Sequence, residues 1–242
     1  MKTSGNKILI TGAGSGIGFA LAQQFIQLGN QVITVDRNIK KQEEARKVLP
    51  ELIPILCDLT NKADIDRLIL TLENQHPDVN MLINNAGVQY HYDFKTETQP
   101  LPRIEKEIQT NVIAPMQLCA LMLPILNSHD EAAIVNVSSA LAFAPKTDAP
   151  VYCATKAAVH NFTQGLRYQL EPTNIKVFEI IPPLVATAMT SGRGKGKITP
   201  EQLATAFIRA FEKDRFEVNI GKIKLFRLLL RIFPTLAEKM LK

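Results

Sequence analysis

Residues 7–28 read KILITGAGSGIGFALAQQFIQL. The run from Lys7 to Thr11 is short and apolar, which predicts a buried strand. A turn with four glycines follows at once, and the apolar periodicity of Phe19 to Leu28 then predicts a helix. Glycines let such a turn bring backbone N–H groups against a pyrophosphate, and the helix N-terminus adds a partial positive charge. The stretch therefore predicts the first βα unit of a dinucleotide-binding sheet, with a glycine turn that binds nothing as the alternative.

The same alternation of strand and helix continues along the chain. Further strands are predicted at residues 31–35, 53–57, 79–83, 132–137, 175–181 and 217–220. Helical patterns separate them at 39–49, 61–75, 103–123, from Tyr152 until Pro172 stops the helix, and at 200–211. This order predicts an α/β fold: a doubly wound parallel sheet of about seven strands, with right-handed crossovers and helices on both faces. A chain of 242 residues fits one such domain, 1–242.

Composition narrows the class of protein. The 46% hydrophobic content is that of an ordinary globular core, and three cysteines in apolar contexts predict buried thiols in a reducing compartment. We expect no secretory signal and no uncharged stretch of the ~20 residues needed to span a bilayer, and hence a cytoplasmic protein. The formal net charge of +5 is mild, its basic residues look spread out and Trp is absent, so we expect no nucleic-acid partner.

The second predicted strand ends in Asp36, 18 positions after Gly18. A carboxylate at about this distance binds the adenosine ribose diol in dinucleotide-binding sheets. A 2′-phosphate there would meet like charge, so Asp36 favours NAD over NADP. Arg37 is able to pair with such a phosphate, which leaves the choice open.

A second functional pattern combines a strand end with a helix. Ser139 follows the strand 132–137, and Tyr152 and Lys156 share one face of the next helix at i,i+4 spacing. A phenol titrates near 10, and an ammonium one turn away is expected to lower the pKa of Tyr152. Tyr152 would then exchange a proton with an alcohol or carbonyl oxygen that the Ser139 hydroxyl holds.

Asn111 lies within the long helical pattern, four residues before Pro115. Proline has no N–H and crowds the carbonyl of the residue four positions earlier. We therefore expect the Asn111 carbonyl to be free for a water molecule, with a tolerated kink as the alternative.

Together these residues resemble one family, the short-chain dehydrogenase/reductases, over residues 7–187. The motifs that carry the resemblance occur in the family's order: Thr11-Gly12 with Gly16 and Gly18, Asp36, Asp58-Leu59, Asn84-Asn85-Ala86-Gly87, Asn111, Ser139, and Tyr152 with Lys156. The resemblance implies an NAD(P)-dependent oxidoreductase with a Rossmann-like domain that acts on an alcohol or carbonyl compound. It implies a catalytic set of Asn111, Ser139, Tyr152 and Lys156.

The resemblance also implies how a cofactor would lie. The cofactor-binding residues would be Gly12, Ser15, Ile17, Gly18, Asp36, Arg37, Asp58, Leu59, Asn85, Ala86, Gly87, Tyr152, Lys156, Val185 and Thr187. Asn111 would complete a water-linked proton path to Lys156, and the family's habit of pairing long helices implies a homodimer or homotetramer.

The chain departs from the family pattern after the strand 175–181. Most members carry Pro-Gly there, whereas this chain has Pro182-Pro183. The second proline stiffens the turn, which makes the assignment of Val185 and Thr187 to the nicotinamide carboxamide less secure. The double proline resembles the subgroup labelled DltE.

Two segments outside the motifs are of interest. Residues 188–200 mix glycines with Arg193, Lys195 and Lys197, which predicts a mobile lid over the substrate. Residues 222–242 predict a basic amphipathic tail. Packing on the domain or against a second subunit is the favoured interpretation of the tail, and contact with an anionic membrane surface is the alternative.

The histidines show no metal-ligand spacing, so no metal site is predicted. His91 is one candidate for the wall of the substrate pocket, and His160 is expected to lie on a helix surface. Two other functions stay open besides an enzyme: a non-catalytic dinucleotide sensor and a membrane-peripheral interaction protein.

Overall fold

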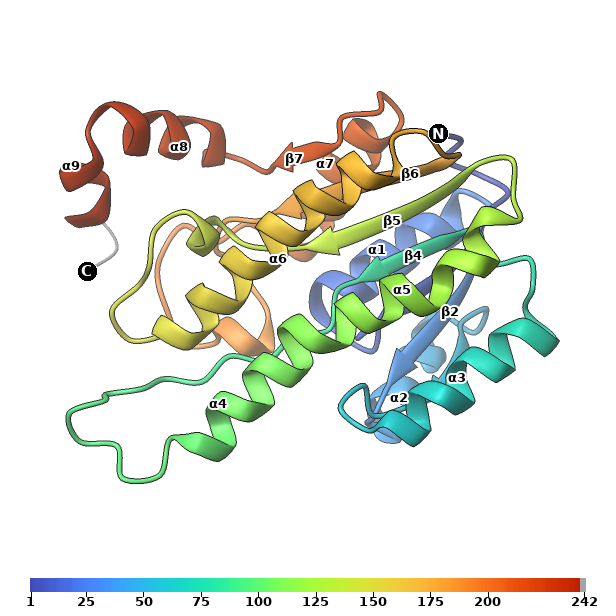
Figure 1. Ribbon diagram of the computed structural model, residues 1–242, viewed down its shortest axis with the longest axis horizontal. Helices are drawn as coiled ribbons and strands as arrows, with labels where there is room; N and C mark the ends of the chain where they lie inside the picture. The colour runs from blue at the N-terminus through green and yellow to red at the C-terminus, as the bar shows by residue number, and fades with distance from the viewer. Residues whose placement is uncertain (240–242) are drawn as a thin grey trace.

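A computed structural model describes residues 1–239, and the last three residues of the predicted tail lie outside the described part. Its centre is a seven-stranded parallel sheet in the order β3-β2-β1-β4-β5-β6-β7 (Figure 1). The strands are β1 (Lys7–Thr11), β2 (Gln31–Asp36), β3 (Ile53–Leu56), β4 (Met81–Asn84), β5 (Ala132–Val137), β6 (Ile175–Ile181) and β7 (Glu217–Asn219). The predicted α/β class, sheet and strand number are confirmed.

The chain winds outward from the middle of the sheet in both directions. β1 pairs in parallel with β2 on one side and with β4 on the other. The strand order therefore reverses between β1 and β4, and ligands of doubly wound sheets bind beyond the carboxyl ends of the strands at such a point. Several residues of the predicted site lie here.

Helices cover both faces of the sheet. They are α1 (Gly16–Gln27), α2 (Ile39–Val48), α3 (Lys62–Gln75), α4 (Leu101–Ile108), the π-helical η1 (Gln109–Ile113), α5 (Ala114–Asn127), α6 (Pro150–Leu170), α7 (Pro200–Phe211), α8 (Ile223–Ile232) and α9 (Pro234–Lys239), with short 3-10 turns η2 (Ala140–Ala142) and η3 (Ala188–Thr190). Figure 1 shows α3, α5 and α6 in front of the sheet and α1 behind it.

Each face has its own hydrophobic core. Phe25 of α1 and Phe207 and Phe211 of α7 are fully buried on one face and meet edge-on or tilted. On the other face, Leu68 of α3 and Leu118 of α5 pack on the apolar residues of the strands. The strands carry apolar residues on both sides because both sides are covered.

The longest helical stretch is not regular. α4, η1 and α5 run on without a break from Leu101 to Asn127, and the π-helical part coincides with the segment before Pro115. This stretch is long and apolar enough to cross a membrane by length and composition, so the expectation that no segment reaches that length is wrong. Leu118, Met122 and Leu126 on this helix nevertheless belong to the core that covers the sheet.

Candidate active site

A cleft of about 300 Å³ opens at the carboxyl ends of β1, β2, β4 and β5. Most of the predicted site residues line it: Gly12, Ser15, Ile17, Asp36, Arg37, Asp58, Leu59, Asn85, Ala86, Gly87, Tyr152, Lys156 and Thr187. Asn111, Ser139, Gly18 and Val185 lie just outside this lining. One cleft therefore contains both the glycine turn and the Tyr-Lys pair, which are about 140 residues apart in the chain.

The glycine turn has the geometry that its sequence predicts. Gly12 and Gly16 have φ values of +69° and +59°, a region that other residues rarely adopt. Position 18 has no room for a side chain, because a Cβ there would lie 2.5 Å from both the Asn85 side-chain nitrogen and the Gly12 carbonyl oxygen. The turn leads directly into the N-terminus of α1, so its backbone suits a pyrophosphate.

Thr11 and Asn85 hold this turn against the end of β4. The Thr11 hydroxyl accepts hydrogen bonds of 3.0 Å from the backbone N–H groups of Asn85 and Ala86. The Asn85 side chain donates to the carbonyl oxygens of Thr11 and Gly12 at 2.9 and 3.2 Å. Asn85 is thus a structural clamp on the cofactor turn as well as a residue of the cleft wall.

Charged side chains line the cleft near the carboxyl end of β2. Asp36 Oδ1 accepts a hydrogen bond from the Asn38 N–H at 2.9 Å. Arg37 NH1 lies 3.8 Å from Asp58 Oδ2. The pKa of Asp58 is lowered: its hydrogen bonds from Thr60 and the nearby Lys106 and Arg37 together outweigh burial, which is the largest single effect and acts in the opposite direction. Asp36, Arg37 and Asp58 therefore all line the same part of the chain's cleft.

Tyr152 lines the cleft and contacts the side chain of Ser139, which lies beside it. Ser139 caps η2, and its oxygen accepts a hydrogen bond from the Leu141 N–H at 3.1 Å. Burial raises the pKa of Tyr152 to about 12, Cys153 adds to the rise, and contact with the Ser139 hydroxyl opposes it. The phenol is therefore protonated at neutral pH.

Lys156 is buried one turn further along α6, at 5% exposure. Its ammonium donates to the Val137 carbonyl oxygen at 2.7 Å and lies 5.7 Å from the centre of the Tyr152 ring. Burial lowers the pKa of Lys156 to about 8, and the negative charge of Glu179 opposes this. The prediction that the pKa of Tyr152 lies below its ordinary value is wrong for the chain by itself, because burial of the phenol raises that pKa.

Asn111 is buried in η1 and clamps the chain after β4. Its Oδ1 accepts from the Val88 N–H at 2.9 Å, and its Nδ2 donates to the Val88 carbonyl at 2.8 Å and to Thr155 Oγ1 at 3.2 Å. A cavity of about 10 Å³, close to the space that one water needs, is lined by Asn111, Pro115 and Lys156 among others. The relay water predicted from Pro115 stays a prediction, and this cavity is the place for it.

Glu107 is a residue that the sequence motifs did not single out. It is fully buried in α4, where its carboxylate accepts from the Tyr90 N–H at 3.0 Å and from the Tyr92 hydroxyl at 2.8 Å. Burial raises the pKa of Glu107, and these two hydrogen bonds oppose the rise. Glu107 thereby fixes the loop that follows Gly87 beside the cleft.

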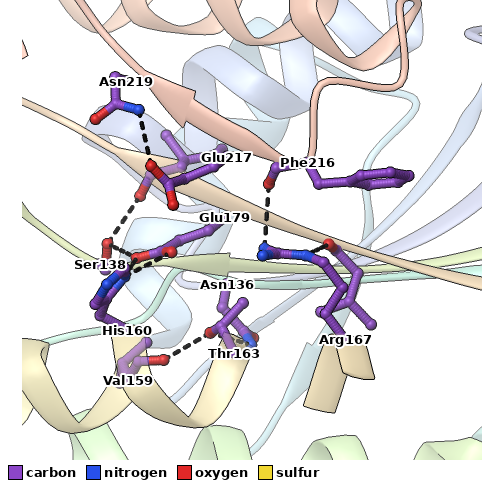
Figure 2. A network of polar contacts seen from close by, with 12 residues as sticks. Asn136, Ser138, Val159, His160, Thr163, Arg167, Glu179, Phe216, Glu217 and Asn219 are labelled. Atoms are coloured by element: carbon purple, nitrogen blue, oxygen red, sulfur yellow. Dashed lines mark hydrogen bonds and ion pairs between the residues drawn. The ribbon is translucent and has the colours of Figure 1, made fainter. Parts of the chain in front are cut away.

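A buried polar network joins α6 to the strands beneath it (Figure 2). Glu179 in β6 is 1% exposed, and its carboxylate accepts a hydrogen bond from the Ser138 hydroxyl and faces His160 Nδ1 at 2.9 Å. His160 follows Lys156 by one turn of α6. The expectation that His160 lies on the helix surface is therefore wrong, since only 20% of its side chain is exposed. No pattern within one segment reveals this pair, because its members belong to a helix and a strand.

The predicted lid, residues 188–200, contacts the loop that follows β4. Arg193 NH1 lies 2.8 Å from His91 Nε2, and His91 Nδ1 lies 3.1 Å from Asp148 Oδ2. Val185 is buried and forms an isolated parallel bridge with Ile198 at the base of the lid. Thr187 lines the cleft, so of the two residues predicted after the double proline only Thr187 reaches its surface.

Comparison with known proteins identifies the family of the chain. The sequence profile described as short chain dehydrogenase matches residues 6–197. An uncharacterized oxidoreductase of Bacillus subtilis (strain 168), DltE, is 38% identical over 230 residues, covering 93% of this chain and 91% of the relative. An uncharacterized oxidoreductase of Staphylococcus aureus (strain USA300) is 30% identical, covering 89% and 94%.

Solved structures have the same fold. A short chain dehydrogenase from Burkholderia cenocepacia J2315 in complex with NADP superposes with a TM-score of 0.88 at 25% identity, covering 100% of this chain and 99% of that one. The chain belongs to the short-chain dehydrogenase/reductase family. It is a DltE-like oxidoreductase of that family, as the double proline Pro182-Pro183 predicts.

Proposed function

We propose that the chain transfers a hydride between a nicotinamide cofactor and the carbon of an alcohol or carbonyl group, with Tyr152 moving the proton. The observation that carries the proposal is that Tyr152 and Lys156 line the same cleft as the glycine turn. Positive-φ glycines at the pyrophosphate position and the absence of room for a Cβ at Gly18 fit a dinucleotide. That cofactor, when bound, supplies or accepts the hydride.

Three side chains would bind the substrate oxygen and move the proton. The oxygen of Ser139 already accepts a backbone hydrogen bond, so its hydroxyl hydrogen is available to a substrate carbonyl oxygen. Tyr152 is held as a protonated phenol, which suits donation of a proton to that oxygen. Lys156 retains most of its charge at neutral pH and stabilises the phenolate that remains. In the direction of carbonyl reduction, this arrangement supplies the proton that the substrate oxygen needs.

The preferred cofactor is NAD in this proposal. Asp36 places a carboxylate at the end of β2 in the cleft wall, where a 2′-phosphate would be repelled. Arg37 lies near Asp58, which reduces its attraction for a phosphate. Solved relatives of similar fold are described in complex with NADP, NAD or NADPH, so the choice depends on these local charges.

The test is a screen of ketones, aldehydes and alcohols that follows nicotinamide absorbance with NADH and NADPH. Ketones are a sensible first set, since a structural relative from Comamonas testosteroni, 25% identical, is described as a bulky-bulky ketone specific alcohol dehydrogenase. Turnover that depends on Tyr152 supports the enzyme. Tight dinucleotide binding without turnover of any class would instead favour the non-catalytic sensor.

We also propose a homo-oligomer that works in a reducing compartment such as the cytoplasm. Leu121 on α5 and Tyr168 on α6 leave apolar surface exposed on the helical face that covers the sheet. The three cysteines, Cys57, Cys119 and Cys153, are free and buried, and burial raises the pKa of each thiol. Light scattering for mass, and thiol titration before and after unfolding, test these two points.

A further inference from the structure

The C-terminal helices expose an unusual amount of apolar surface. Figure 1 shows α8 and α9 standing apart from the layers of the domain, beyond β7. Ile223 and Ala237 are buried at their two ends. More than half of each of five large side chains between them is exposed: Leu225, Leu228, Ile232, Phe233 and Leu236. The domain therefore does not cover this face, and packing of the whole tail on its own domain is not what the structure shows.

The net charge of the chain is concentrated in the same segment. Residues 1–221 contain 22 Lys and Arg and 22 Asp and Glu, whereas residues 222–242 contain six basic residues and one acidic residue. The whole formal charge of +5 therefore belongs to the last 21 residues. The expectation that the basic residues are spread out does not hold for the net positive charge, because acidic residues balance the basic ones in residues 1–221.

The exposed apolar and basic residues form one continuous surface on α8. Leu225, Leu228 and Ile232 follow the helical spacing i, i+3, i+7 and share one face. Lys224 and Arg231 are exposed and flank that stripe on one side. Arg227 instead turns inward, where it pairs with Glu217 and stacks 4.3 Å from the centre of the Phe143 ring. We call Leu225, Leu228, Ile232, Lys224 and Arg231 the tail surface.

We propose that the tail surface docks the protein on an anionic lipid membrane. A helix with an apolar face and flanking Lys and Arg inserts that face at the headgroup boundary and attracts anionic lipids. A second copy of the chain is a less suitable partner for the tail surface than a membrane. Its own tail carries the same positive charge, and the rest of its chain has no net charge to offer in compensation.

Docking would place the membrane beside the proposed active site. α8 follows the carboxyl end of β7, the same edge of the sheet at which the cleft opens. Arg227 joins α8 to Phe143, which is four residues beyond Ser139. The substrate would then be an amphiphilic alcohol or carbonyl compound that enters from the lipid surface. Docking itself does not depend on the proposed reaction and is measured without it.

The experiment is co-sedimentation of the full chain with two kinds of vesicle, phosphatidylcholine alone and phosphatidylcholine with about 30% phosphatidylglycerol. The charge variant is K224E/R231E, with K40E/K47E as its control, since Lys40 and Lys47 are exposed lysines on α2. The apolar variant is L225S/L228S, with V48S/L70S as its control, because Val48 and Leu70 are 63% and 58% exposed elsewhere on the protein.

Binding to the anionic vesicles alone is the expected result, and about 0.5 M salt should weaken it. K224E/R231E should reduce the partition coefficient roughly 30-fold or more, at about 1 kcal/mol for each cation. L225S/L228S should also reduce it, whereas both control variants should bind as the parent does. Thermal unfolding checks that all four variants fold.

Three outcomes would overturn the proposal. One is no binding to anionic vesicles at low salt. Another is an equal loss in K40E/K47E, which would mean that only total charge matters. The third is a parent dimer that L225S/L228S converts to a monomer without any vesicle binding, which would make the tail surface an interface between copies.

Discussion

His160 Nδ1 lies 2.9 Å from Oε2 of Glu179, a carboxylate that is 1% exposed at the centre of β6. A buried carboxylate is costly unless charges and hydrogen bonds compensate it. Here the Ser138 hydroxyl donates to it, and its negative charge raises the pKa of nearby Lys156 against the effect of burial. Glu179, which His160 contacts, therefore acts electrostatically on Lys156, the proposed catalytic lysine.

Glu179→Gln removes this charge with little change of shape. The pKa of Lys156 should fall further, so the decline of kcat/KM on the alkaline side should move to lower pH. Stability should also decrease by about 1–3 kcal/mol, because His160 and Ser138 lose a charged acceptor. Glu217→Gln is the matched control, since Glu217 is a strand carboxylate paired with Arg227 on α8. A pH profile that stays in place in Glu179→Gln would contradict the role of Glu179.

Tyr152→Phe removes the phenol oxygen and leaves the ring. We expect kcat to fall by about 10²–10⁴-fold, the range for loss of a general acid, while nicotinamide binding measured by fluorescence quenching persists. Tyr168→Phe is the control, because Tyr168 lies on the same helix with 64% exposure. Turnover of Tyr152→Phe within a few-fold of the parent would exclude this phenol as the proton donor.

Lys156→Met should stabilise the protein at pH 7 while abolishing turnover. The pKa of Lys156 in the folded chain, about 8, lies below the ordinary value of 10.5. Between these values the unfolded chain binds more protons than the folded chain, so the stability of the parent rises with pH across this window. Below pH 8 the parent bears the full cost of burying the Lys156 charge, and the variant does not. After the variant's loss of the hydrogen bond to Val137 is subtracted, we expect the variant to be more stable by about 1–3 kcal/mol. Urea unfolding at pH 7 and pH 10 measures the free energy of unfolding of the parent and of Lys156→Met. The difference between the two proteins should be smaller at pH 10 than at pH 7. An equal difference at both pH values would contradict the effect of burial on Lys156.

Asp36→Ala should shift cofactor preference toward NADPH. We expect the ratio of kcat/KM for NADH to that for NADPH to fall by about tenfold or more, since about 1.4 kcal/mol corresponds to a factor of ten. Arg37→Ala should change the ratio in the opposite direction by removing a cation that is exposed near the ribose end. Initial rates with NADH and NADPH measure this ratio in each variant. A ratio in Asp36→Ala equal to that of the parent would refute the role of Asp36 in an NAD preference.

Two glycines give a test of the turn that is independent of activity. Gly18→Ala places a Cβ 2.5 Å from Asn85 Nδ2 and the Gly12 carbonyl, so the protein should lose about 1–3 kcal/mol and bind dinucleotide more weakly. Gly165→Ala, in the middle of α6, meets nothing within 4 Å and should stabilise the protein by about 0.5–1 kcal/mol. Equal unfolding temperatures for the two variants would show that the turn is less tightly packed than described.

The sequence predicted the structure correctly where the residues of a single segment define its conformation. The glycines from Gly12 to Gly18, Asp36 at the end of β2, and the Tyr152–Lys156 spacing each predict a position in the site because strand ends and helix turns have set geometries. β6 was predicted with the bounds that the structure has, Ile175–Ile181, because an apolar run between turn residues defines both ends.

Other properties were decided only when distant segments met. The Glu179–His160 pair, the clamp of Asn111 on Val88 and the burial of Glu107 each join separate elements, and no period within one element reports them. Likewise the pKa of Tyr152 is set by how much of the protein surrounds the phenol, which the Lys156 spacing alone does not reveal. The sequence by itself determined the family, the sheet and the positions of the residues that we propose as catalytic groups. The tertiary structure decided how far those groups are buried and which residues support them, because burial and contacts across the chain are properties of the packed whole.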